Sequence, residues 1–130
     1  MVDRSIGQKF VVEAIRQQAY KAEALDDHFP QDCPDHVWLE HAGKNGWVVL
    51  TRDKHVRTRV TEWQMLRAAG VLVFVIAART INREILVEIV TRNLDGMNRI
   101  AKTADRPAVY SLGRSRSPQR LFLRDGRKWS

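Results

Sequence analysis

Several acidic residues stand where the chain is expected to leave a buried strand or to begin a helix. They are Asp3, Asp26 or Asp27, Asp35 and Asp53. The carboxyl ends of parallel strands lie on one edge of a sheet, and ligands bind beyond that edge. A helix that packs back along the sheet starts near the same edge, which brings Asp35 within reach. Each of these residues could instead cap a turn or a helix.

Clustered carboxylates repel one another unless a cation lies between them. Mg²⁺ and Mn²⁺ take oxygen ligands and keep several waters. A cation held in this way lowers the pKa of a water and neutralises a phosphoryl oxygen, which is the chemistry of phosphodiester hydrolysis. The same edge is expected to carry the cations that a phosphate needs, namely Arg4, Arg52, Lys54, Arg57 and Arg59.

The elements that must position these residues follow from hydrophobic periodicity and turn signals. Helices are expected over 7–19, 34–44, 61–69 and from a cap at Thr80 or Asn82 through Ala101; strands are expected over 47–50, 71–77 and 109–112, with shorter ones at 20–25 and 121–123. Continuous apolar strands such as Val71–Ala77 are buried on both faces. The alternation predicts an α/β protein with a central, mostly parallel sheet and helices on both faces.

Composition limits the class of protein. The 130 residues suit one domain, and no apolar run is long enough to span a membrane. The single cysteine is typical of a reducing cytoplasm and argues against a thiolate zinc site. The net charge of +7 is concentrated in a basic tail. We therefore expect a domain over 1–112 and a basic tail over 113–130 that suits nucleic acid or an acidic protein partner.

At several places the chain resembles the PIN-like domains, in particular the toxin nucleases of VapBC-type toxin–antitoxin systems. The segments that carry the resemblance are 3–7, 27–30, 34–39 and 46–54. The most specific is Thr51-Arg52-Asp53 directly after an apolar strand. The resemblance implies a three-layer α/β/α endoribonuclease that binds Mg²⁺ or Mn²⁺ and cuts RNA. It also implies a cognate antitoxin and a homodimer.

Carried over by position, the resemblance assigns Asp3, Asp35 and Asp53 as catalytic metal ligands. Arg4, Thr51, Arg52 and Lys54 are then expected to contact the RNA. Glu40 competes with Asp35, but the two lie about 140° apart around one helix, and Glu62 is the nearest candidate for a fourth acid. The alternative function is a PIN-like module that binds RNA or a protein partner without cleaving RNA.

Overall fold

The computed structural model describes residues 1–2, 8–52, 60–76, 82–113 and 117–120, without the side chains of residues 8–9 and 60–63. The helices are α1 (Gln8–Gln17), the 3-10 turn η1 (Leu25–Asp27), α2 (Asp35–Lys44), α3 (Val60–Ala69) and α4 (Arg83–Thr103). The strands are β1 (Val48–Thr51), β2 (Leu72–Ile76), β3 (Ala108–Leu112) and β4 (Gln119–Arg120). From α2 to β3 the helices and strands alternate along the chain.

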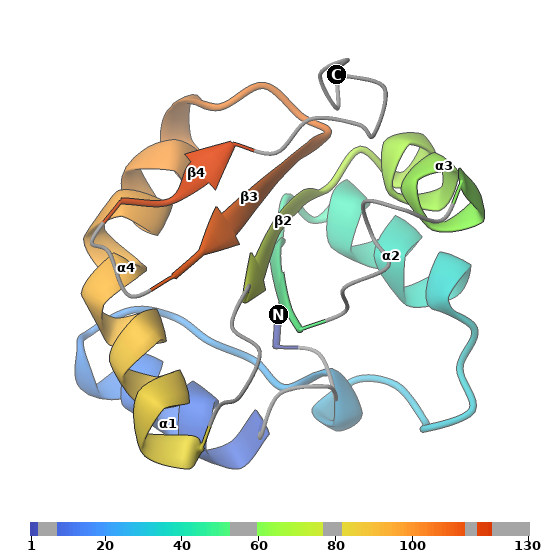
Figure 1. Ribbon diagram of the computed structural model, residues 1–130. Helices are drawn as coiled ribbons and strands as arrows, with labels where there is room; N and C mark the ends of the chain where they lie inside the picture. The colour runs from blue at the N-terminus through green and yellow to red at the C-terminus, as the bar shows by residue number, and fades with distance from the viewer. Residues whose placement is uncertain (3–7, 53–59, 77–81, 114–116, 121–130) are drawn as a thin grey trace.

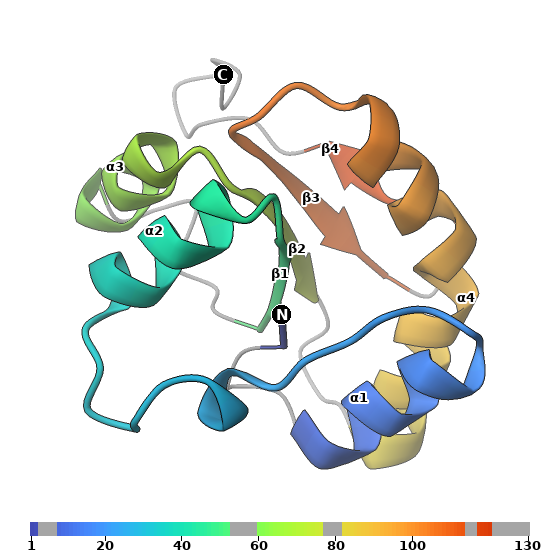
Figure 2. The same cartoon turned by 180° about the vertical axis from the view of Figure 1, so that it is seen from behind.

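The four strands form one sheet in the order β1-β2-β3-β4. The first two pairings are parallel, and β4 runs antiparallel to β3. Figure 1 and Figure 2 show α1 and α4 on one face of this sheet and α2 and α3 on the other. The expected three-layer α/β architecture with a mostly parallel central sheet is therefore confirmed.

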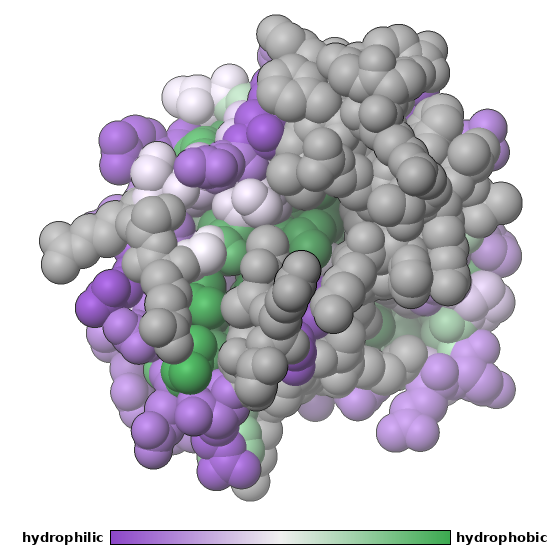
Figure 3. Space-filling view, viewed as in Figure 1, coloured by the Kyte–Doolittle hydropathy of each residue, from purple (hydrophilic) through white to green (hydrophobic). Residues whose placement is uncertain are grey.

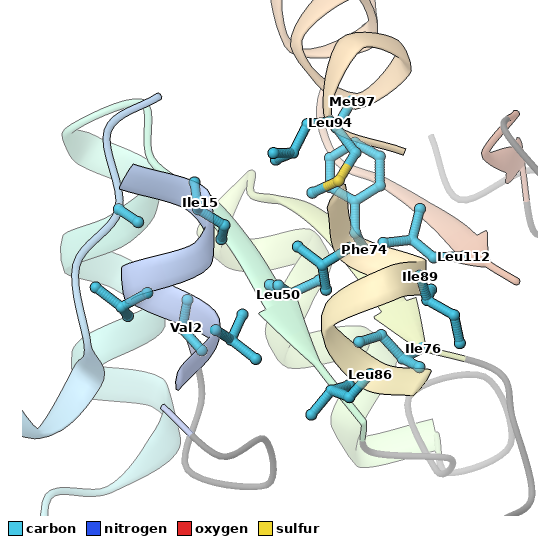
Figure 4. Close-up of a cluster of buried hydrophobic side chains, with 14 of the residues drawn as sticks. Val2, Ile15, Leu50, Phe74, Ile76, Leu86, Ile89, Leu94, Met97 and Leu112 are labelled. Carbon is cyan, nitrogen blue, oxygen red and sulfur yellow. The ribbon is translucent and has the colours of Figure 1, made fainter. Parts of the chain in front are cut away.

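The strand β2 is fully buried because helices cover both of its faces. Successive side chains of a strand point to opposite faces, so Leu72, Phe74 and Ile76 join the core cluster beneath α1 and α4 (Figure 4). Val73 and Val75 join the second cluster beneath α2 and α3. The continuous apolar run that predicted this strand reflects burial on both faces.

Among the described residues before Asp3, one residue, Val2, pairs with the sheet on both sides. Val2, which is 2% exposed, bridges in parallel to Ala24 on one side and to Leu50 on the other. Backbone hydrogen bonds from Val2 N to Glu23 O (2.8 Å) and from Leu25 N to Val2 O (3.0 Å) hold it there. The short strand expected over 20–25 is consequently reduced to the single pairing at Ala24.

Helix boundaries differ slightly from those expected. Asn82 is the N-cap of α4, and its side chain accepts a hydrogen bond from Ile85 N at 2.9 Å. Pro34, expected as the first helical residue, is instead the N-cap of α2 with an extended backbone. Thr61, expected as a cap, lies inside α3, which begins one residue earlier. The expected strand 121–123 lies outside the described residues.

On the face drawn in Figure 3, the coloured residues along the margins are mostly hydrophilic, and a strip of hydrophobic residues is visible near the middle. In the portion of the chain that the structure describes, no helix combines the length and apolar character needed to span a membrane.

Candidate functional site at the carboxyl edge of the sheet

The carboxyl edge of the sheet collects the ends of the segments that precede the predicted ligands. Val2 pairs in parallel with Leu50, and Leu50 is followed by Thr51 at the end of β1. The described segments that lead to Asp3 and Asp53 therefore run side by side and in the same direction toward one edge of the sheet. Thr51, opposite Val75 in the register, is a buried polar residue with 4% of its surface exposed.

Asp35 is the predicted ligand that the structure describes. It opens α2, where a carboxylate is favoured by the helix macrodipole. The helix runs toward the amino end of β1, because Trp47 N donates to Ala42 O at 2.8 Å. Asp35 therefore begins α2 on the side of the sheet where β1 ends.

A buried tryptophan orients the Asp35 carboxylate. Trp38 Nε1 donates to Asp35 Oδ1 at 3.0 Å, and Trp38 itself is 5% exposed within the cluster beneath α2 and α3. Asp35 is exposed. An exposed carboxylate held by a fixed indole is suited to present its second oxygen to a cation.

The remaining predicted site residues divide into two groups. Asp3, Arg4, Asp53 and Lys54 lie outside the described residues, so their roles stay predictions. Arg52 is described: it follows β1 directly, is half-buried and lines a pocket. Within the described part of the chain, no group of three or more His, Cys, Asp or Glu side chains could hold a metal ion.

The alternative acids have contacts of their own or lie outside the description. Glu40 Oε1 forms an ion pair with Lys44 Nζ at 3.0 Å on the exposed surface of α2. The side chain of Glu62 is outside the described set. His28 packs edge-on against Trp47 at 5.2 Å and lies 3.4 Å from Glu23 Oε2, contacts that account for it as a surface packing residue.

A pocket of about 240 Å³ is lined by the first turns of α1 and α4 and by the residue that follows β1. Among the described residues its lining is Phe10, Val11, Arg52, Asn82, Arg83, Leu86 and Val87. Sequence reasoning identified Arg52 here but missed Phe10 and Arg83. A signal for Arg83 was present, since a cation in the first turn of a helix opposes the macrodipole.

A second cavity, of about 150 Å³, lies between α1, α4 and the sheet. Its described lining is mainly apolar and includes Val2, Ile15, Phe74 and Met97, with no carboxylate among the lining residues. It has none of the chemistry expected of a nuclease centre. The carboxyl edge is therefore the stronger candidate site.

The fold and the edge site define a class: a three-layer α/β/α domain whose candidate chemistry lies beyond the ends of parallel strands. A family model described as "PIN like domain" matches residues 1–78. The chain belongs to this PIN-like domain family, as the residues around Asp3, Asp35 and Thr51 suggested.

One curated relative is similar over most of both chains. It is named "Putative ribonuclease VapC45" and comes from Mycobacterium tuberculosis. It is 23% identical over 113 residues, which cover 84% of this chain and 80% of the relative. No solved structure matched the chain.

Proposed function

We propose that the protein is the toxin component of a VapBC-type toxin–antitoxin system, a metal-dependent endoribonuclease that hydrolyses RNA phosphodiester bonds. The observation that carries the proposal is the parallel pairing of Val2 with Leu50. It makes the two segments that lead to Asp3 and Asp53 leave the sheet at one edge. Membership of the PIN-like family and similarity to a protein named as a ribonuclease support it.

In this proposal Asp3, Asp35 and Asp53 hold Mg²⁺ or Mn²⁺. The donor type fits a hard cation, because Asp35 is an exposed carboxylate oriented through one oxygen by Trp38. When bound, the cation lowers the pKa of a coordinated water and neutralises charge on the phosphoryl group. Arg4, Arg52 and Lys54 hold the RNA backbone, and Thr51 supports Asp53.

The proposed partners are RNA, a cognate antitoxin and a second copy of the chain, all in the cytoplasm. We assign the nuclease domain to residues 1–112 and a basic tail to 113–130. Part of that tail, β4, pairs with β3 at the edge of the sheet. The antitoxin is proposed to cover the carboxyl edge, since blocking that edge would stop cleavage.

A second candidate function is RNA or partner binding without cleavage. It is favoured by the size of the inner strand before Asp3, of which Val2 is the one bridged residue that the structure describes. The two candidates differ in whether the protein turns over RNA.

The test compares RNA cleavage by the wild-type protein and by Asp53→Asn in Mg²⁺ and in Mn²⁺. Asp105→Asn is the matched control, because Asp105 is an exposed aspartate near the start of β3, at the opposite edge of the sheet. We expect the wild-type protein and Asp105→Asn to cleave RNA and Asp53→Asn not to cleave it. Chelating the metal should abolish cleavage by all three proteins. RNA binding without metal-dependent cleavage by the wild-type protein would establish the second function instead.

A further inference from the structure

The 240 Å³ pocket at the first turns of α1 and α4 contains an exposed aromatic ring with a specific partner. Phe10 is 40% exposed, whereas the neighbouring Val11, Val12 and Ile15 of the same helix are buried in the core. One exposed apolar side chain is ordinary on a protein surface. What distinguishes Phe10 is that Cζ of Arg83 lies 3.5 Å from the centre of its ring.

This separation places the guanidinium group directly over the face of the ring. Arginine stacks in this way because its planar cation is weakly hydrated and is attracted to the ring face. Phe10 contacts one face of the guanidinium group, and a nucleobase can stack on a guanidinium plane as it does on an aromatic ring. Among the described residues, no carboxylate forms an ion pair with Arg83.

The pocket also has a charge that complements nucleic acid. Arg52 and Arg83 both line it, one at the end of β1 and the other as the first residue of α4. Positive charge at the start of a helix is unfavourable for the macrodipole. A bound phosphate between these two cations would remove that cost and form charge-assisted hydrogen bonds with both.

The size and position of the pocket limit what can bind there. At about 240 Å³ it is smaller than the roughly 300–1,000 Å³ typical of sites for drug-sized ligands, so it suits a fragment of a larger substrate. Arg52 directly precedes Asp53 in the chain. The pocket therefore adjoins the edge to which the proposed function assigns cleavage.

We infer that this pocket binds one unpaired nucleotide of single-stranded RNA beside the scissile bond. Arg52 and Arg83 hold its phosphate, and its base stacks on the guanidinium group of Arg83, which Phe10 supports. The inference rests on the proposed function for its substrate, and it adds Phe10 and Arg83 as the residues that select unpaired RNA. Paired bases cannot reach the stack, because their faces are already covered in the duplex.

The test measures binding of a short, labelled, mixed-sequence oligoribonucleotide by fluorescence anisotropy in EDTA, single-stranded and as a duplex, over a series of salt concentrations. The variants are Arg83→Gln and Phe10→Leu. The matched controls are Arg99→Gln, an exposed arginine about 24 Å further along α4, and Val37→Ala, the other large hydrophobic residue found exposed among the described ones.

We expect both pocket variants to raise the Kd for single-stranded RNA by roughly five-fold or more, the effect of losing one base stack. Arg83→Gln should also lower the slope of log K against log salt by about one, whereas Phe10→Leu should leave the slope unchanged. The controls should bind within about two-fold of wild type. The Phe10→Leu effect should be absent for the duplex.

Equal losses in Arg83→Gln and Arg99→Gln would overturn the inference, because they would show binding to net charge alone. An equal effect of Phe10→Leu on duplex and single-stranded RNA would overturn the stacking of an unpaired base. If Phe10→Leu fails to fold, as judged by circular dichroism, Arg83→Gln at an exposed position carries the test. If Asp53→Asn abolished cleavage but Arg83→Gln and Phe10→Leu bound single-stranded RNA as the wild-type protein does, the proposed role of the pocket would be refuted. The proposed nuclease function would be unaffected by that result.

Discussion

The substitution Trp38→Phe tests whether a buried indole positions the proposed metal ligand Asp35. The phenyl ring keeps most of the apolar contact in the cluster beneath α2 and α3, where Trp38 is 5% exposed. What is lost is the donor to Asp35 Oδ1, now 3.0 Å away. Asp35 itself is unchanged in charge and in its place at the start of α2.

The size of the effect follows from what the hydrogen bond does. Hydrogen bonds to charged groups contribute about 1.5–3 kcal/mol, and the exposure of Asp35 puts this one at or below the lower end of that range. Removing the partner that orients a metal ligand typically costs about 10- to 100-fold in metal affinity or activity. We therefore expect the metal concentration for half-maximal cleavage to rise about 10-fold, with most of kcat recovered at saturating metal. Unfolding should become easier by about 1–2 kcal/mol, from the smaller ring and the lost bond.

The assay titrates RNA cleavage with Mn²⁺ and with Mg²⁺ and follows urea unfolding in parallel. Trp47→Phe is the matched control: Trp47 is half-buried against the same cluster, and its described ring contacts are with His28 and His41. The positioning role of Trp38 would be refuted if Trp38→Phe reached half-maximal cleavage at the same metal concentration as the wild-type protein while Asp35→Asn lost activity. Full activity in Asp35→Asn would remove Asp35 from the site and make Glu40→Gln the next variant to test.

Three further predictions concern stability, measured by urea unfolding. Gly43→Ala should destabilise the fold by about 1–3 kcal/mol through overpacking, because the added Cβ would lie 1.9 Å from Ala69 O where α2 meets α3. Gly46→Ala is the comparison: Gly46 has a φ of +67° but open space around it, so the substitution should cost about 1 kcal/mol from backbone strain alone. Asn82→Ala should cost about 1 kcal/mol by removing the N-cap of α4, and Asn82→Ser should restore most of it. Asn93→Asp should cost at least about 3 kcal/mol at neutral pH, because Asn93 is fully buried and its amide donates to two backbone carbonyls, which the new carboxylate cannot do.

The sign of the pH dependence checks the last of these. Burial raises the pKa of the introduced carboxyl above the roughly 3.9 of an unfolded aspartate. The folded state then binds more protons, so stability should be lost as pH rises through that range and regained in acid. A pH-independent loss in Asn93→Asp would contradict this account. If Gly43→Ala had the same free energy of unfolding as the wild-type protein, α2 and α3 would have to move apart at no cost. If Asn82→Ala had the wild-type free energy of unfolding, the N-cap of α4 would contribute nothing to stability.

Local chemistry in the sequence was enough to predict the main helices and strands. Gly46 and Gly70, both with positive φ, end α2 and α3 as the sequence indicates. The run from Val71 to Ala77 predicted a strand buried on both faces, because only side chains covered above and below can all be apolar. The order of these elements, with right-handed crossovers, was sufficient to predict the three-layer fold.

The tertiary structure decided what depends on contacts between distant segments. No local pattern shows that one residue, Val2, bridges both Ala24 and Leu50, since that pairing depends on backbone groups far apart in the chain. Likewise Phe10 has the helical spacing of a core residue, yet it lies on the surface under Arg83, which is in another helix. Hydrophobic periodicity indicates which face of a helix or strand is apolar, but not which side chain from another element packs against that face. The sequence by itself therefore determined the elements, the family, the candidate acids and the edge of the sheet on which to expect them. Only packing across the sheet revealed how Val2 is paired and which residues line the pocket beside that edge.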